Sequence, residues 1–194
     1  VKVICWTEPE KIFIVNDCLP EAVRPILDGR ADIVVPKRDS EAWKTYPQYQ
    51  AELEQHANKL WNAILKKRGF LSNEAEDLDV WFGPKFFKND PELVKIFLEI
   101  YEFEKRNLKI DESVDPKKWS NAIFLPILNA LAKGYRVISI PIAYRHPPKQ
   151  TRQEQDSDEF RRKREMQFKD IIINTIHLIR LLEKNPKSRL YNKN

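Results

Sequence analysis

Three short segments of the chain have the apolar pattern of β-strands. Residues 1–6 (VKVICW) are apolar with alternation, residues 31–36 (ADIVVP) form an apolar run that ends at a proline, and residues 136–142 (RVISIPI) alternate again. Alternation is typical of a strand with one buried face, whereas an unbroken apolar run is typical of a strand buried on both faces. We therefore predict three strands in a largely buried sheet.

Longer segments have the apolar spacing of helices. They span residues 17–28, 47–68, 90–105, 117–133 and 160–184. Asp17 and Asp90 begin two of these segments as expected N-caps, while Gly29 and Gly134 follow two of them as expected stop signals. A strand, a helix and a second strand within the first 36 residues suggest a crossover unit. The predicted fold class is α/β, with a mixed sheet flanked by helices.

The buried faces of the two longest helices can be predicted from this spacing. On residues 47–68 the expected stripe is Leu53, Ala57, Leu60 and Ile64. On residues 160–184 it is Phe168, Ile172, Ile176, Ile179 and Leu182. The first of these helices also carries the polar residues Gln48, Gln50, Glu54 and Asn58. These residues either border a ligand pocket or form the solvent-exposed face of an amphipathic helix.

Composition places the chain among globular proteins. Its 194 residues are 42% hydrophobic and 32% charged, enough for one substantial core. Cys5 and Cys18 have no metal-binding or disulfide-framework spacing, which favours a reducing compartment, and no apolar stretch is long enough to span a membrane. We expect a cytoplasmic protein without a membrane span. The oligomeric state stays open.

Two carboxylates, Glu8 and Glu10, follow the end of the first predicted strand. Side chains at positions i and i+2 of a strand end point to the same side. Paired carboxylates can hold a hard divalent cation such as Mg²⁺ or Mn²⁺ and leave positions open for phosphate. The alternative is a solvated turn.

Three segments in order resemble the family 2 type of nucleotide-sugar glycosyltransferases. Residues 8–38 (EPEK to ADIVVPKR) resemble the segment in which an acidic pair ends a strand and a helix leads to the next strand. Residues 79–83 (DVWFG) resemble the acceptor-side segment, and residues 119–145 resemble the segment that closes the catalytic domain. The resemblance implies a GT-A fold whose nucleotide-binding part lies upstream of Val1. Glutamates replace the two aspartates of the family's acidic pair.

The resemblance also implies roles for individual residues. Glu8, Glu10 and His146 would be the ligands of a divalent metal cofactor, although a surface position for His146 is an equal alternative. Asp79 would be the catalytic base, or else an aspartate that caps a turn. Residues expected to bind the donor diphosphate or the acceptor are Lys37, Arg38, Gly83, Arg145, Lys149 and Gln150. Trp81, Phe82, Phe86 and Phe87 either form a sugar-stacking wall or belong to the core.

Residues 1–159 would then form the catalytic domain, with residues 160–194 as a C-terminal helix and tail packed on it. The expected activity is transfer of a hexose from a nucleotide-diphosphate sugar to a small acceptor, which the net charge of +5 suggests is phosphorylated or acidic. The alternatives are a non-catalytic relative, and a nucleic-acid-binding module that uses the basic run RRKRE at 161–165. A small-molecule partner is preferred over nucleic acid.

Overall fold

A four-stranded sheet forms the centre of the fold. The structure is a computed structural model that describes residues 1–99, 101, 123–155 and 157–184, apart from the side chains of Glu10 and Ile12. The strands are β1 (Val3–Trp6), β2 (Ile33–Arg38), β3 (Lys85–Lys88) and β4 (Val137–Ile142). They lie in the order β1-β3-β2-β4, so the mixed α/β sheet expected from the sequence is confirmed.

Strand direction decides where the connecting loops meet. β3 is antiparallel to both of its neighbours, with Val3 opposite Lys88 and Ile33 opposite Phe87, while β2 and β4 are parallel. Strands β1, β2 and β4 therefore run in one direction and end at the same edge of the sheet. Because β3 runs the other way, it begins at that edge. β1 and β2 form a crossover unit, but β3 is inserted between them.

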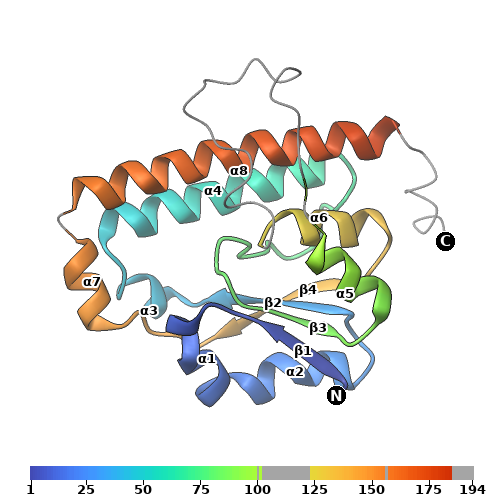
Figure 1. Ribbon diagram of the computed structural model, residues 1–194, viewed down its shortest axis with the longest axis horizontal. Coiled ribbons are helices and arrows are strands. Elements are labelled where there is room, and N and C mark those ends of the chain that lie inside the picture. The colour runs from blue at the N-terminus through green and yellow to red at the C-terminus, as the bar shows by residue number, and fades with distance from the viewer. Residues whose placement is uncertain (100, 102–122, 156, 185–194) are drawn as a thin grey trace.

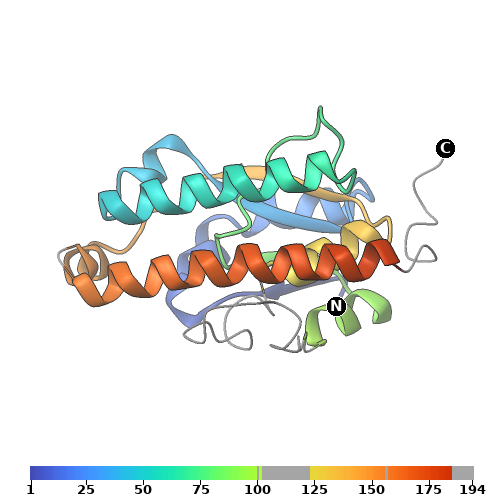
Figure 2. The ribbon, with the colours of Figure 1, turned by 90° about the horizontal axis from the view of Figure 1, so that it is seen from above.

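Helices cover both faces of the sheet (Figure 1). They are α1 (Ile12–Asp17), α2 (Leu19–Leu27), α3 (Ser40–Trp43), α4 (Gln48–Lys67), α5 (Pro91–Leu98), α6 (Leu125–Ala132), α7 (Pro148–Glu154) and α8 (Asp158–Lys184), with a 3-10 turn, η1 (Pro9–Lys11). α1 and α2 lie on one face, and α4, α5, α6 and α8 lie on the other. α4 and α8 run side by side along the molecule (Figure 2).

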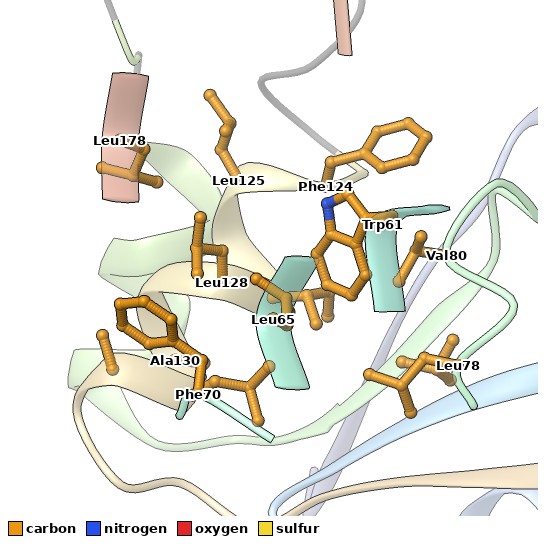
Figure 3. Packing of buried hydrophobic residues seen from close by; sticks show 14 of the residues in the cluster. Trp61, Leu65, Phe70, Leu78, Val80, Phe124, Leu125, Leu128, Ala130 and Leu178 are labelled. Carbon is orange, nitrogen blue, oxygen red and sulfur yellow. The ribbon is translucent and has the colours of Figure 1, made fainter. Parts of the chain in front are cut away.

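Alternation along the strands divides the core into two clusters. Ile33 and Val35 of β2 point toward the α4–α8 face, whereas Val34 between them points toward α1 and α2. Trp61 of α4 is fully buried in the larger cluster, next to Leu65 and Phe124 (Figure 3). Its indole Nε1 donates a hydrogen bond of 3.1 Å to the Thr175 hydroxyl of α8, which ties the two long helices together.

Most predicted elements are present, with shifted ends. The caps Asp90 and Gly134 are confirmed: the Asp90 carboxylate accepts from the amides of Glu92 and Leu93, and Gly134 has a φ of 81° after α6. Residues 102–122 lie outside the described residues, and they include the start of the helix predicted at 117–133.

The helix predicted at 17–28 is wrong in its start. Asp17 is the last residue of the preceding helix α1 instead of an N-cap, and α2 covers only Leu19–Leu27 of the predicted range. Pro20 lies in the first turn of α2, where its missing N–H costs no hydrogen bond, so a new helix begins after Cys18.

Besides α1 and η1, three elements were missed because their sequences carry turn or loop signals. β3 lies in the aromatic segment after Gly83 and Pro84, and α3 is a single turn capped by Asp39. α7 begins inside the stretch YRHPPKQ, which was predicted to be a loop; Pro148 instead occupies the first turn of this helix.

The buried face of α4 differs from the predicted apolar stripe. Gln50, Glu54, Asn58 and Asn62 are all buried, whereas Leu53, Leu60 and Ile64 are only partly buried. The expectation that Gln50, Glu54 and Asn58 lie on a solvent-exposed helix face is therefore wrong, although Gln48 is exposed. The reason is that charged residues from the sheet edge lie under this helix and require polar partners. Within the described residues, no helix is long and apolar enough to cross a membrane.

We predict that Trp61 carries much of the packing between α4 and α8. Trp61→Ala should destabilise the protein by about 3–5 kcal/mol because it leaves a large cavity. Trp61→Phe should cost about 1–2 kcal/mol because Thr175 loses its donor. Urea unfolding measures both values, and Lys59→Ala on the exposed side of α4 is the control, expected within about 0.5 kcal/mol of wild type. Equal stability of all three variants would contradict this role.

Candidate functional site

A pocket of about 470 Å³ opens at the sheet edge where β1, β2 and β4 end. Four of the residues predicted from the sequence line it: Glu8, which follows β1, Arg38 at the end of β2, Gly83 before β3, and Gln150 of α7. Loops at this edge of an α/β sheet are the usual place for a ligand. Strand direction thus brings together residues that lie far apart in the chain.

Glu8 lies directly against Gly83. A side chain added at Gly83 would place its Cβ on the Glu8 carboxyl group, so only glycine leaves room for that carboxylate. Glu8 Oε2 is buried and accepts no hydrogen bond from the described residues. A buried carboxylate oxygen without a partner is costly unless a ligand or cation satisfies it. This position is therefore suited to bind a cation or a hydrogen-bond donor.

Arg38 forms the main ion pair beneath the pocket. Its Nε and Nη2 each donate to the Asp79 carboxylate at 2.8 Å, and its Nη1 donates to Glu54 at 2.6 Å. Asn58 of α4 donates to the same Asp79 at 2.6 Å, and the Trp43 ring lies 3.8 Å from the guanidinium carbon. The bidentate geometry is the one in which arginine binds carboxylate most strongly.

Electrostatics keep Asp79 and Arg38 ionised. Burial alone would raise the pKa of Asp79, but the charge and hydrogen bonds of Arg38 outweigh it and hold that pKa below its usual range. Burial would likewise lower the pKa of Arg38, yet Asp79, Tyr46 and Glu54 hold it well above the ordinary value. Both Asp79 oxygens are occupied, which favours a positioning role for Asp79; the catalytic-base role stays a prediction without support from this geometry.

His146 is buried, so the surface alternative is wrong. Its ring stacks on Tyr46 with centroids 4.1 Å apart, and its Nε2 lies 3.7 Å from Glu154 Oε2. Neither ring nitrogen has a hydrogen-bond partner among the described residues. Burial would raise the pKa of Glu154, but the nearby His146 ring and the hydrogen bond that Gln150 donates to this carboxylate hold that pKa below its usual range. Glu154 also lines the pocket with Glu8, whereas His146 lines a separate cavity.

Sequence reasoning missed three cations of the pocket. Lys11 of η1 and Lys163 and Arg164 of α8 all line it. Arg164 lies 3.9 Å from Glu54 and donates to Gln167 at 3.1 Å, so it partly offsets the second carboxylate paired with Arg38. The available signal was the basic run at 161–165, which we linked to nucleic acid; two of its residues border this pocket instead.

Three predicted binding residues lie away from the pocket. Lys37 is paired with Glu76 at 2.9 Å, Arg145 is paired with Asp39 at 3.1 Å, and Lys149 is exposed on α7. Among the aromatic residues, Phe86 and Phe87 belong to the core, while Trp81 and Phe82 are buried and also line the pocket. Phe86 and Phe87 are therefore core residues, whereas a sugar-stacking role of Trp81 and Phe82 stays a prediction.

The predicted metal ligands are only partly placed. The side chain of Glu10 lies outside the described residues, and within the described part of the chain no three His, Cys, Asp or Glu side chains form a cluster that could hold a metal. Glu8 fits a hard cation through its unpartnered oxygen, but His146 does not share its pocket. Metal binding stays a prediction.

Comparisons with known proteins give no relative. No protein-family model, no curated protein and no solved structure matches this chain. The resemblance to nucleotide-sugar glycosyltransferases and the GT-A fold therefore stay predictions, and the site has to be judged by its own geometry.

We predict that removing the Asp79 charge destabilises the protein in a pH-dependent way. Asp79→Asn leaves Arg38 buried with one carboxylate fewer, which should cost about 3 kcal/mol at pH 7. The pKa of Asp79 is lower in the folded than in the unfolded chain. Its contribution is therefore complete above the unfolded pKa of about 4 and is lost as the pH falls below it.

Urea unfolding at pH 7, 5 and 3.5 measures this difference. The difference in the free energy of unfolding between wild type and Asp79→Asn should stay constant from pH 7 to 5 and shrink at pH 3.5. The control combines Arg38→Met, Glu54→Leu and Asp79→Leu, which removes all three buried charges and should be less destabilised than Asp79→Asn. A gap that is unchanged at pH 3.5 would contradict a lowered pKa for Asp79.

We predict that Gly83→Ala displaces the Glu8 carboxylate without unfolding the protein. The three atoms nearest to the new Cβ belong to the end of the flexible Glu8 side chain, so the melting temperature should change by less than about 2 °C. Ligand binding that depends on Glu8 should fall by about tenfold or more. The combined Glu8→Ala, Gly83→Ala variant should bind no more weakly than Glu8→Ala. Additive losses would show that Gly83 acts independently of Glu8.

Proposed function

We propose that this chain belongs to a glycosyltransferase that moves a hexose from a nucleotide-diphosphate sugar to a small acidic or phosphorylated acceptor. The observation that supports it most is the unpartnered, buried Oε2 of Glu8 on Gly83, in a pocket bordered by Lys11, Lys163 and Arg164. This combination has a carboxylate for a divalent cation and basic side chains for phosphate oxygens.

Breaking the bond between the sugar and the diphosphate places negative charge on the leaving group. A divalent ion held by Glu8, together with Glu10 on the same turn, would supply positive charge for that group. Lys11, Lys163 and Arg164 would bind the remaining phosphate oxygens or the anionic part of the acceptor. Gln150 and Gln153 of α7 would add hydrogen-bond donors and acceptors for hydroxyl groups.

The polar residues beneath the pocket would hold its shape. Arg38 links β2, α4 and the segment that contains Asp79, and its charge is already neutralised by Asp79 and Glu54. It is therefore assigned to positioning, while Trp81 and Phe82 would provide the apolar wall against which a sugar ring packs.

Binding of nucleoside diphosphates tests this proposal. The full-length protein is heated with UDP, GDP, ADP or CDP, each with and without MnCl₂. A ligand at one hundred times its Kd stabilises by about 2.7 kcal/mol. That corresponds to a rise in melting temperature of about 5–10 °C for a protein of this size. We expect one of these nucleotides to give such a rise in the presence of manganese.

The variant Glu8→Gln tests whether the stabilisation by manganese and nucleotide depends on this pocket or on nonspecific binding elsewhere. It should abolish the manganese-dependent part of the rise, whereas Glu21→Gln, a change of an exposed glutamate on α2, should leave it intact. Release of nucleoside diphosphate from the matching nucleotide sugar then measures the activity. Absence of stabilisation by any nucleotide, with or without manganese, would overturn the proposal.

A further inference from the structure

Lys85, the first residue of β3, is completely buried at the sheet edge. Its Nζ donates to three backbone carbonyls of one short segment: Val80 at 3.3 Å, Gly83 at 3.1 Å, and Phe82. A buried lysine is expensive unless its charge and its donors are satisfied. All three donors of this ammonium are used on the segment that carries Gly83.

This segment, residues 78–83, has little secondary structure of its own and yet is buried. Its backbone groups need partners, and α4 supplies some of them: Asn62 bonds both the amide and the carbonyl of Leu78, and Asn58 accepts from the Trp81 amide at 3.1 Å. Lys85 supplies the partners on the other side. The path of residues 78–83 is thus fixed by side chains from two different elements.

We propose that Lys85 is the positioning residue for Glu8, because it holds residues 80–83 in the path on which the Glu8 carboxylate rests. The contact between Glu8 and Gly83 leaves no spare room, so a shift of Gly83 moves the carboxylate. The charges of Asp79 and Glu8 also act on the Lys85 ammonium through space. This inference rests on the proposed function for the role of Glu8, but not for the contacts of Lys85.

The charge and the donors, more than the bulk, distinguish Lys85 from an apolar residue at this position. Methionine has a similar length and fills a similar volume, so Lys85→Met keeps the packing and removes the hydrogen bonds. Burial lowers the pKa of Lys85 to about 7, so the measurements are made at pH 6, where the side chain is mostly an ammonium group. Lys88→Met, at the exposed end of the same strand, is the matched control.

Hydrogen exchange tests whether Lys85 keeps residues 78–83 in place. In Lys85→Met, the amides of residues 78–83 should exchange about tenfold faster or more, while those of α2 and α8 stay unchanged. Lys88→Met should resemble wild type throughout. Unchanged exchange at residues 78–83 in Lys85→Met would overturn the proposal. Should Lys85→Met fail to fold, Lys85→Gln is measured instead; its shorter side chain and two N–H donors cannot serve all three carbonyls, so the same amides should exchange faster by a smaller factor, and unchanged exchange would overturn the proposal.

Ligand binding tests the link to Glu8. The manganese-dependent affinity for the nucleoside diphosphate should fall about tenfold in Lys85→Met, and the manganese-independent part should not change. Lys85→Met combined with Glu8→Gln should bind no more weakly than Glu8→Gln alone. Additive losses would show that Lys85 acts elsewhere. Should wild type bind no nucleoside diphosphate, the proposed function fails, and hydrogen exchange alone still decides whether Lys85 positions the segment.

Discussion

The ion pair between Arg38 and Asp79 is the interaction on which the architecture of this sheet edge depends. Arg38 ends β2, Asp79 lies in the segment before β3, and Glu54 extends the contact to α4. Two carboxylates around one guanidinium are tolerable in the interior only when further donors complete them, and Asn58, Gln50 and Arg164 do so. Arg38 therefore determines which face α4 turns toward the sheet, and the inward face of α4 is polar along much of its length.

The strands and longer helices could be predicted because apolar periodicity reports burial directly. β2 and β4 follow their predicted ranges within two or three residues, and α4 nearly coincides with its range. The buried face of α4 could not be predicted in the same way, since periodicity assumes that buried positions are apolar. Gln50, Glu54 and Asn58 break that assumption only because a charged partner from residues far away in the chain lies beneath them.

The site was predictable as far as strand order allowed. Glu8, Arg38 and Gln150 share a pocket because they follow β1, β2 and β4, whose common edge could be inferred from the α/β pattern, whereas Gly83 precedes the missed strand β3 and was assigned through the family resemblance alone. Lys11, Lys163 and Arg164 could not be assigned to it, since their contribution depends on how α8 lies over α4. Lys37 and Arg145 follow strand ends as well, yet each is paired with a nearby carboxylate instead. A position at a strand end thus places the backbone, but not the side chain.

The insertion of β3 between β1 and β2 has a consequence for how the chain acquires its structure. Val3 pairs with Lys88, and Ile33 pairs with Val137, so neither N-terminal strand has a neighbour close to it in sequence. During synthesis, β1 and β2 leave the ribosome well before either partner exists, with their apolar side chains and backbone groups unpaired. The sheet forms only after β3 has emerged, and the pocket forms later still, when α8 has joined. This topology therefore requires that the unpaired edges and apolar side chains of β1 and β2 be kept from aggregating until β3 has been synthesised.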